Sequence, residues 1–273
     1  MFGTYFGYEL VKQGKRDLRD LGALALITVV LGGIHALKVP MLAAIALPLM
    51  AMITFCIPIV ILVEAAIDYW QELYGERGYF TMTLPIKGHT IFAVKILRAI
   101  IAGIYSTAVA ILLGLFDAWA FATNRGVEVS TIITTVVDSL TDAGALPLSL
   151  AILLAFIWLV CMVITMSAAM TIGAQARWNH LGAGAAFIAI IAAYIANQLV
   201  ISLASFFIPM NINMTTREFR LDSIFMMTVG PGASGLGEDN SWMPLGLFIV
   251  LPLWTLFMAL WGARTINRKT SLR

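Results

Sequence analysis

Four acidic residues recur at every fourth position in one stretch of the sequence: Glu64, Asp68, Glu72 and Glu76. On a helix this spacing places all four carboxylates on one face. Such a face has the chemistry of an ion-pairing surface, and like charges at this spacing destabilise an isolated helix. We therefore expect basic side chains to compensate the acids, most simply cations on a partner protein. An ordinary solvated loop is the alternative interpretation.

Sequence patterns for nucleotide hydrolysis and metal catalysis are missing. No G-x-x-x-x-G-K-[ST] loop occurs, so this chain is not expected to hydrolyse ATP by that route. His35, His89 and His180 lie on separate segments without carboxylate or cysteine companions at metal-ligand spacing. Cys56 and Cys161 each lie inside a long apolar run, which favours two buried small side chains. We predict no catalytic residue, no metal site and no cofactor in this chain.

One glycine-rich stretch, Gly232-Ala233-Ser234-Gly235, resembles the serine motif of rhomboid intramembrane proteases. That chemistry needs a histidine base on a later helix, whereas His180 is the last histidine of the sequence. A flexible turn is therefore the better interpretation. A lipid-modifying membrane enzyme is an alternative, with four acidic residues as acid–base or metal groups. These acids are Glu218, Asp222, Glu238 and Asp239.

The composition of the chain is typical of a protein that lies in a membrane. The 273 residues are 60% hydrophobic and 12% charged, with a mean hydropathy of +0.92. These values lie outside the usual range for soluble globular chains. The 17 Lys and Arg against 15 Asp and Glu give a net charge of only +2, which is too small to neutralise many phosphates. We therefore expect membrane lipid as a partner and no nucleic acid.

Six uncharged runs are long enough to cross a bilayer as helices. They cover residues 21–37, 40–66, 91–122, 146–174, 182–208 and 243–263. The fold class is therefore an all-α integral membrane protein in which residues 21–273 form one six-helix domain. Ala36 to Val39 is a tight turn, because Pro40 suits the first position of a helix. Residues 1–20 predict an amphipathic helix in the headgroup plane, with its cations towards water.

The positive charges orient the chain, because cytoplasmic segments retain Lys and Arg. With the N-terminus inside, only four of the 17 basic residues fall on the outer side: Lys38, Arg125, Arg217 and Arg220. Both termini are therefore expected in the cytoplasm. We expect a multi-pass protein of the cell membrane, namely the plasma membrane of a bacterium.

Three connections and a tail join these spans. The inner connection covers residues 67–90, and the cytoplasmic tail covers 264–273. The outer connection 123–145 has a helical spacing of apolar residues and is expected to lie flat on the surface. In the outer connection 209–242, prolines and a glycine cluster break regular elements. Part of this last loop is expected to dip into the outer leaflet and return.

The spans carry few polar groups. Glu64, Lys95, Arg98 and Asp117 lie near span ends and are expected to reach water by snorkelling. An ion-driven carrier therefore lacks the intramembrane charges that it needs. The fifth span has a polar stripe. Its side chains either form hydrogen bonds between helices or line a substrate path, and both interpretations remain. The stripe contains Asn197, Gln198 and Ser202.

The inner connection resembles that of a known family. Tyr74-Gly75-Glu76-Arg77-Gly78-Tyr79, followed by Thr83-Leu84-Pro85 and then Lys95, is similar to the inner loop of permease subunits of type-two ATP-binding cassette (ABC) exporters. In that family the loop forms a coupling helix that binds a separate ATPase subunit. The similarity extends to the N-terminal amphipathic helix, six spans, both termini inside and a long outer loop before the last span.

The resemblance implies a permease that pairs with an identical or related permease and binds two ATPase subunits, on which ATP and Mg are held. The residues expected to form the ATPase-coupling interface are Glu72, Tyr74, Gly75, Glu76, Arg77 and Gly78. Glu76 or Arg77 would pair across this interface, and Gly75 would set the bend. The expected cargo is hydrophobic or amphipathic, such as a peptide, a lipid-like molecule or a drug. The rival classes are the lipid-modifying enzyme and a channel or structural assembly subunit.

Overall fold

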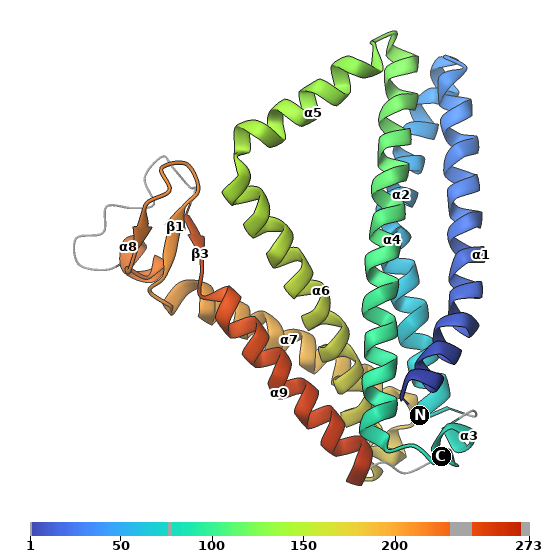
Figure 1. Ribbon diagram of the computed structural model, residues 1–273, viewed down its shortest axis with the longest axis vertical. Coiled ribbons are helices and arrows are strands. Elements are labelled where there is room, and N and C mark those ends of the chain that lie inside the picture. The colour runs from blue at the N-terminus through green and yellow to red at the C-terminus, as the bar shows by residue number, and fades with distance from the viewer. Residues whose placement is uncertain (1, 76–77, 84, 230–241, 269–273) are drawn as a thin grey trace. The chain divides into compact units, whose positions relative to one another are not determined.

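The computed structural model describes residues 2–75, 78–83, 85–229 and 242–268, most of which are helical (Figure 1). Six helices are long and apolar enough to cross a membrane. They are α1 (Phe2–Ala36), α2 (Pro40–Leu73), α4 (Gly88–Arg125), α6 (Ala145–Gly173), α7 (Ala183–Phe207) and α9 (Leu247–Arg268). The chain is therefore a multi-pass membrane protein, and the six predicted spans are confirmed.

The chain divides into two compact units, Met1–Leu148 and Ser149–Arg273. In the first unit, α1, α2 and α4 run side by side (Figure 1). Their apolar core contains Leu21, Ile57, Ile61, Ala102 and Leu113. The outward faces of these helices are apolar, as expected for surfaces that contact acyl chains.

The turn between α1 and α2 has the predicted position, because α1 ends at Ala36 and α2 begins at Pro40. His35 is buried and donates a hydrogen bond from Nδ1 to the backbone oxygen of Ala43, at 2.9 Å. The side chain of Asn124, near the end of α4, donates to the backbone oxygen of His35 at 2.7 Å. These two bonds hold the ends of α1, α2 and α4 together at this end of the bundle.

Helix α1 differs from the prediction in two ways. It is continuous from Phe2 to Ala36, so no helix boundary separates residues 1–20 from the first span. Its charged side is turned inwards: Glu9 and Asp17 are buried, whereas Val11 is 59% and Leu18 is 73% exposed. An interfacial helix would have the opposite arrangement. The reason is that charges on α2 and α4 pair with those of α1, as described below.

The three helices of the bundle are longer than a bilayer requires. They contain 35, 34 and 38 residues, which corresponds to roughly 51–57 Å at 1.5 Å per residue, against about 30 Å of hydrocarbon. With the α1–α2 turn at one membrane surface, roughly 20 Å of each helix extends past the other surface. The acidic residues of α2 lie in this extension.

Close packing of α1 against α4 gives a first prediction. A Cβ atom on Gly32 would lie 2.5 Å from Cε1 of Phe116, whereas one on Gly33 would have no neighbour within 4 Å. We expect Gly32→Ala to destabilise the chain by about 1 kcal/mol, because the Phe116 ring has to move. Gly33→Ala is the matched control. Thermal unfolding in detergent measures both, and an equal effect of the two substitutions would contradict this packing.

Up to α7, three shorter helical elements connect the long helices, two of them in the first unit and one in the second. The short helix α3 (Gly78–Thr83) follows α2 and lies at the end of the bundle where α1 begins (Figure 1). Helix α5 (Val129–Ala143) follows α4 and confirms the helix predicted from the spacing within residues 123–145. A turn of 3₁₀ helix covers Ala176–Leu181 in the second unit.

The second unit contains a small sheet that the sequence did not predict. Within 209–242, β1 (Asn211–Asn213) pairs antiparallel with β2 (Phe219–Arg220) and with β3 (Trp242–Pro244), and α8 (Ile224–Val229) follows β2. The expectation that this loop has no regular element was therefore wrong for these residues. The glycine cluster and the expected re-entrant part include 230–241, which lie outside the described residues.

Hydrogen bonds of two asparagines explain the sheet. Asn211 is fully buried, and its Nδ2 atom donates to the backbone oxygen of Asp222 at 2.5 Å. Asn213 Oδ1 accepts hydrogen bonds from the backbone N–H groups of Thr215 and Thr216, at 2.8 and 2.9 Å. This arrangement is an Asx-type turn, in which an asparagine side chain replaces a backbone acceptor. It reverses the chain between β1 and β2.

Candidate functional site

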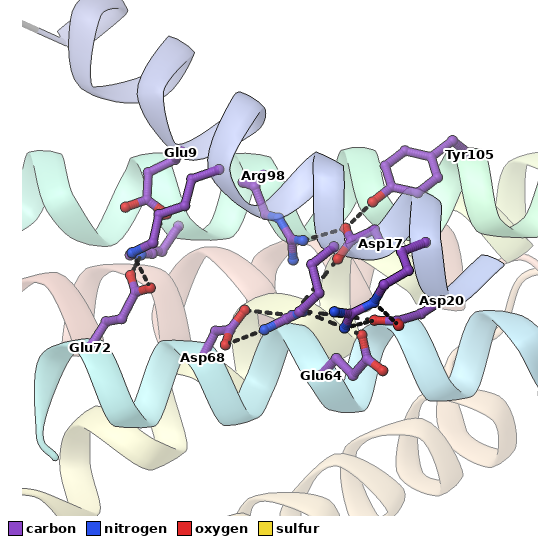
Figure 2. Close-up of polar contacts among 12 residues, drawn as sticks. Glu9, Asp17, Asp20, Glu64, Asp68, Glu72, Arg98 and Tyr105 are labelled. Carbon is purple, nitrogen blue, oxygen red and sulfur yellow. Dashed lines mark hydrogen bonds and ion pairs between the residues drawn. The ribbon is translucent and has the colours of Figure 1, made fainter. Parts of the chain in front are cut away.

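The polar residues of the first unit gather into one cluster between α1, α2 and α4, which we call the ion-pair network (Figure 2). The three acids of α2 are four positions apart and therefore lie on one face of that helix, while α1 and α4 contribute pairs with a spacing of three or four, such as Lys12/Arg16 and Lys95/Arg98. Its members are Glu9, Lys12, Arg16, Asp17, Arg19, Asp20, Glu64, Asp68, Glu72, Lys95, Arg98 and Tyr105.

Lys95 lies at the centre of one half of the network. Its side chain is buried, with 3% exposed, and Nζ lies 2.7 Å from Glu9 Oε2. The same Nζ atom donates to Oε2 of Glu72. The other carboxylate oxygen of Glu72 accepts a hydrogen bond from Lys12 Nζ at 2.9 Å. One buried ammonium group therefore joins α4 to both α1 and α2.

Arginine residues organise the other half. Arg16 binds Asp68 through two nitrogen–oxygen contacts of 2.6 Å and lies 3.6 Å from Glu64. Bidentate arginine–carboxylate pairs fix direction as well as distance. Asp17 is buried and accepts hydrogen bonds from Arg98 and from the hydroxyl of Tyr105 (Figure 2).

The pairings define the register of the helices. From Lys12 to Arg16, α1 advances by four residues, while the partner on α2 moves back by four, from Glu72 to Asp68. This is the relation that antiparallel neighbours require. A shift of either helix by one residue would separate these charges inside the bundle, where an unpaired charge is costly. The network therefore holds α1, α2 and α4 as one body.

Two expectations from the sequence are corrected here. Cations on a partner protein were expected to compensate the acidic face, but Lys12, Arg16 and Lys95 of this chain pair with Asp68 and Glu72. Lys95 and Arg98 were expected to snorkel, but they are only 4% and 3% exposed. Both outcomes have the same cause, which is that α1, α2 and α4 pack side by side and bring acids and bases of this chain into contact.

The spacing of the basic residues on α1 is a signal that could have identified their partners on α2. Lys12 and Arg16 have the same spacing of four as the acids at 64, 68 and 72. Two complementary faces with one period are typical of neighbouring helices that form ion pairs. The spacing alone therefore predicts that the bases of α1 pair with the acids of α2. It does not predict that Lys95 of α4 joins these pairs.

The predicted coupling residues that the structure describes lie at the end of α2, in the turn directly after it and at the start of α3. Glu72 is 5% exposed and belongs to the ion-pair network. Tyr74 is buried, and its ring lies against those of Tyr69 and Trp70. The backbone N–H groups of Tyr74 and Gly75 both donate to the oxygen of Trp70, at 2.8 and 3.0 Å. The chain therefore leaves α2 through a tightly bonded turn.

The rest of this predicted interface is partly described. Gly78 begins α3, and its N–H group donates to the oxygen of Gly75 at 2.9 Å. Glu76 and Arg77 lie outside the described residues. On α3, Tyr79 is 71% exposed, although the sequence analysis did not select it as an interface residue. Its aromatic side chain is available to a partner protein at this end of the bundle.

The polar stripe of the fifth predicted span lies on α7 in the second unit. Asn197 and Gln198 line a cavity of about 120 Å³ between α6 and α7. The thiol of Cys161 on α6 donates to Asn197 Oδ1 at 3.6 Å, and Gln198 Nε2 donates to the Tyr194 hydroxyl at 2.9 Å. Ser202 is exposed. Asn197 thus makes an interhelical contact and also faces open space.

The residues proposed for the enzyme alternatives are dispersed or lie outside the described ranges. Glu218 is exposed and lies 3.4 Å from Arg220. Ser234, Glu238 and Asp239 are not among the described residues. Within the described ranges, no three His, Cys, Asp or Glu side chains gather as a metal site.

No protein-family model, curated protein or solved structure matches this chain.

Proposed function

We propose that this chain is the permease subunit of an ATP-binding cassette exporter. In this proposal a separate ATPase subunit binds the turn after α2 and the short helix α3. One observation carries the proposal: α3 connects two long helices that the ion-pair network holds to each other and to α1. A displacement of α3 would therefore move three membrane-spanning helices together, as a rigid-body transition requires.

The charge distribution supports contact with a soluble ATPase. Most Lys and Arg residues fall on the side of the membrane that carries the network and α3, and positive charge is retained in the cytoplasm. The helical extensions of roughly 20 Å would then project into the cytoplasm. They would present α3 away from the lipid, where an ATPase subunit could reach it.

The remaining parts of the proposal follow the resemblance of the inner connection. A second permease, identical or related, would complete the pathway, and two ATPase subunits would bind ATP and Mg. The cargo would be a hydrophobic or amphipathic compound that passes along the spans. The cavity lined by Asn197 and Gln198 is a candidate part of that path, because it offers amide groups between two apolar helices.

The first test concerns the two charged residues of the turn. We expect Glu76→Ala combined with Arg77→Ala to reduce the recovery of a co-purified ATPase subunit by about tenfold, because a charge-assisted contact is lost. Glu218→Ala combined with Arg220→Ala removes an exposed Glu–Arg pair elsewhere in the chain and is the control. The measurement is the amount of ATPase that co-elutes in mild detergent. Unchanged recovery in the Glu76/Arg77 variant would contradict the proposed contact.

A cross-linking experiment tests the role of α3 directly. A photoreactive phenylalanine replaces Tyr79, which is 71% exposed, or Phe219 on β2, which is 51% exposed. We expect the probe at position 79, and not the probe at 219, to cross-link to a chain with a G-x-x-x-x-G-K-[ST] loop. No cross-link to such a chain from position 79 would refute the proposed function.

A further inference from the structure

The first unit contains a cavity at the corner where α5 leaves α4, lined by residues of α2, α4 and α5. Its volume is about 380 Å³, and small-molecule sites usually enclose about 300–1,000 Å³. Leu47, Phe121, Ile132 and Val136 form much of its wall. Among the described lining residues, Asp117 is the one that carries a charge.

The position of Asp117 makes an unpaired carboxylate costly. It lies eight residues before the end of α4 at Arg125, or about 12 Å along the helix. With the end of α4 at the membrane surface, Asp117 is inside the hydrocarbon layer, where isolated charges are rare and mark functional sites. Its buried Oδ1 atom makes no hydrogen bond in the described part of the chain, although the Thr54 hydroxyl of α2 interacts with the carboxylate. The Arg125 guanidinium stacks on the Phe121 ring, at 5.5 Å, and not on this carboxylate.

The Thr135 side chain adds a hydrogen-bond acceptor to the lining of the cavity. The hydroxyl of Thr135, on α5, already donates to the backbone oxygen of Thr131 at 2.7 Å. Its oxygen can therefore only accept a hydrogen bond from a ligand. Together with the carboxylate of Asp117, this gives the cavity hydrogen-bond acceptors, a negative charge and apolar walls. Such a lining suits a ligand whose polar end is a cation with N–H donors only.

We propose that this cavity binds the primary ammonium group of a cationic amphiphile. An ammonium group has three N–H donors and no acceptor, so it would pair with the Asp117 carboxylate and donate to the Thr135 oxygen. The alkyl part would contact Leu47, Ile132 and Val136 and continue into the lipid. The inference goes beyond the proposed function, because the cavity is formed by this chain alone and its test needs no ATPase subunit.

The test uses a dodecylamine that carries a photoreactive diazirine, with the matching dodecyl alcohol as the neutral probe. The full chain is placed in nanodiscs of phosphatidylcholine, a lipid that contains no primary ammonium group. We expect the amine to label peptides of α2, α4 and α5 about tenfold more than the alcohol does, as a charge-assisted hydrogen bond implies. Competition by phosphatidylethanolamine would identify a lipid headgroup as the source of the ammonium group. Competition by unlabelled dodecylammonium alone would identify a free amphiphile.

Three variants test whether labelling depends on the charge of Asp117. Asp117→Asn should reduce labelling by the amine about tenfold, and Asp117→Glu should keep most of it. Asp138→Asn removes an exposed carboxylate of α5 that is not among the lining residues and should leave labelling unchanged. Gel filtration of each variant confirms that it is folded. Equal labelling of Asp117→Asn and the original chain, or equal labelling by amine and alcohol, would overturn the proposal.

Discussion

Lys95→Met is expected to remove much of the stability of the chain. The buried ammonium group of Lys95 contacts Glu9 and Glu72, and its loss leaves Glu9 buried without a cation partner among the described residues. Removing one partner of a buried ion pair costs about 3–5 kcal/mol, while whole domains are stable by only about 5–15 kcal/mol. Thermal unfolding in detergent should shift down by roughly 10 °C or more.

Two further variants make this prediction specific. Lys87→Met removes an exposed cation from the residue before α4 and should change the unfolding temperature little. Adding Glu9→Gln to Lys95→Met should recover part of the loss, because Glu72 still has Lys12 at 2.9 Å. A double variant that is no more stable than Lys95→Met would show that the uncompensated carboxylate is not the cause.

Gly173→Ala is expected to have the second largest effect. A Cβ atom on Gly173, the last residue of α6, would lie 2.7 Å from the backbone oxygen of Ala185 and 2.7 Å from Cα of Ala186. Backbone atoms of α7 cannot move aside as a side chain does, so the two helices must separate. We expect a cost of about 1–3 kcal/mol, which exceeds that of Gly32→Ala. A lower unfolding temperature in detergent is the measurement.

The control for this substitution lies on the facing helix. A Cβ atom on Gly184, near the start of α7, would have no neighbour within 4 Å. Gly184→Ala should therefore be neutral, or stabilising by about 0.5–1 kcal/mol because alanine restricts the unfolded chain. If Gly173→Ala is as stable as Gly184→Ala, the close contact of α6 with α7 is wrong.

Local signals in the sequence predicted the elements of this fold well. Long apolar runs identify spans because a helix satisfies its own backbone in lipid, and Pro40 marks the start of α2 where the structure has it. For the acidic residues after residue 64, the sequence left a continued helix and a solvated loop open, and the structure has the helix, with Glu72 in the last turn of α2. Each of these signals is contained within a few helical turns.

The arrangement of charges could not be predicted in the same way. Lys95 and Glu9 are 86 positions apart in the sequence, and no local pattern states that their helices are neighbours. Without that knowledge, a partner protein was the simplest source of cations, and water was the simplest destination for Lys95. The small sheet was missed for a related reason, because β1 and β3 pair across a long connection.

The order in which the network forms has a consequence for biogenesis. The ribosome completes α1 and α2 before α4, so the pairs of Lys12 and Arg16 with α2 can form in a nascent hairpin. Glu9 and Asp17 have no basic partner from α4 until residues 95 and 98 are synthesised. Until then the hairpin exposes two carboxylates that belong inside the bundle. The buried half of the network can therefore be completed only after the third span has been synthesised.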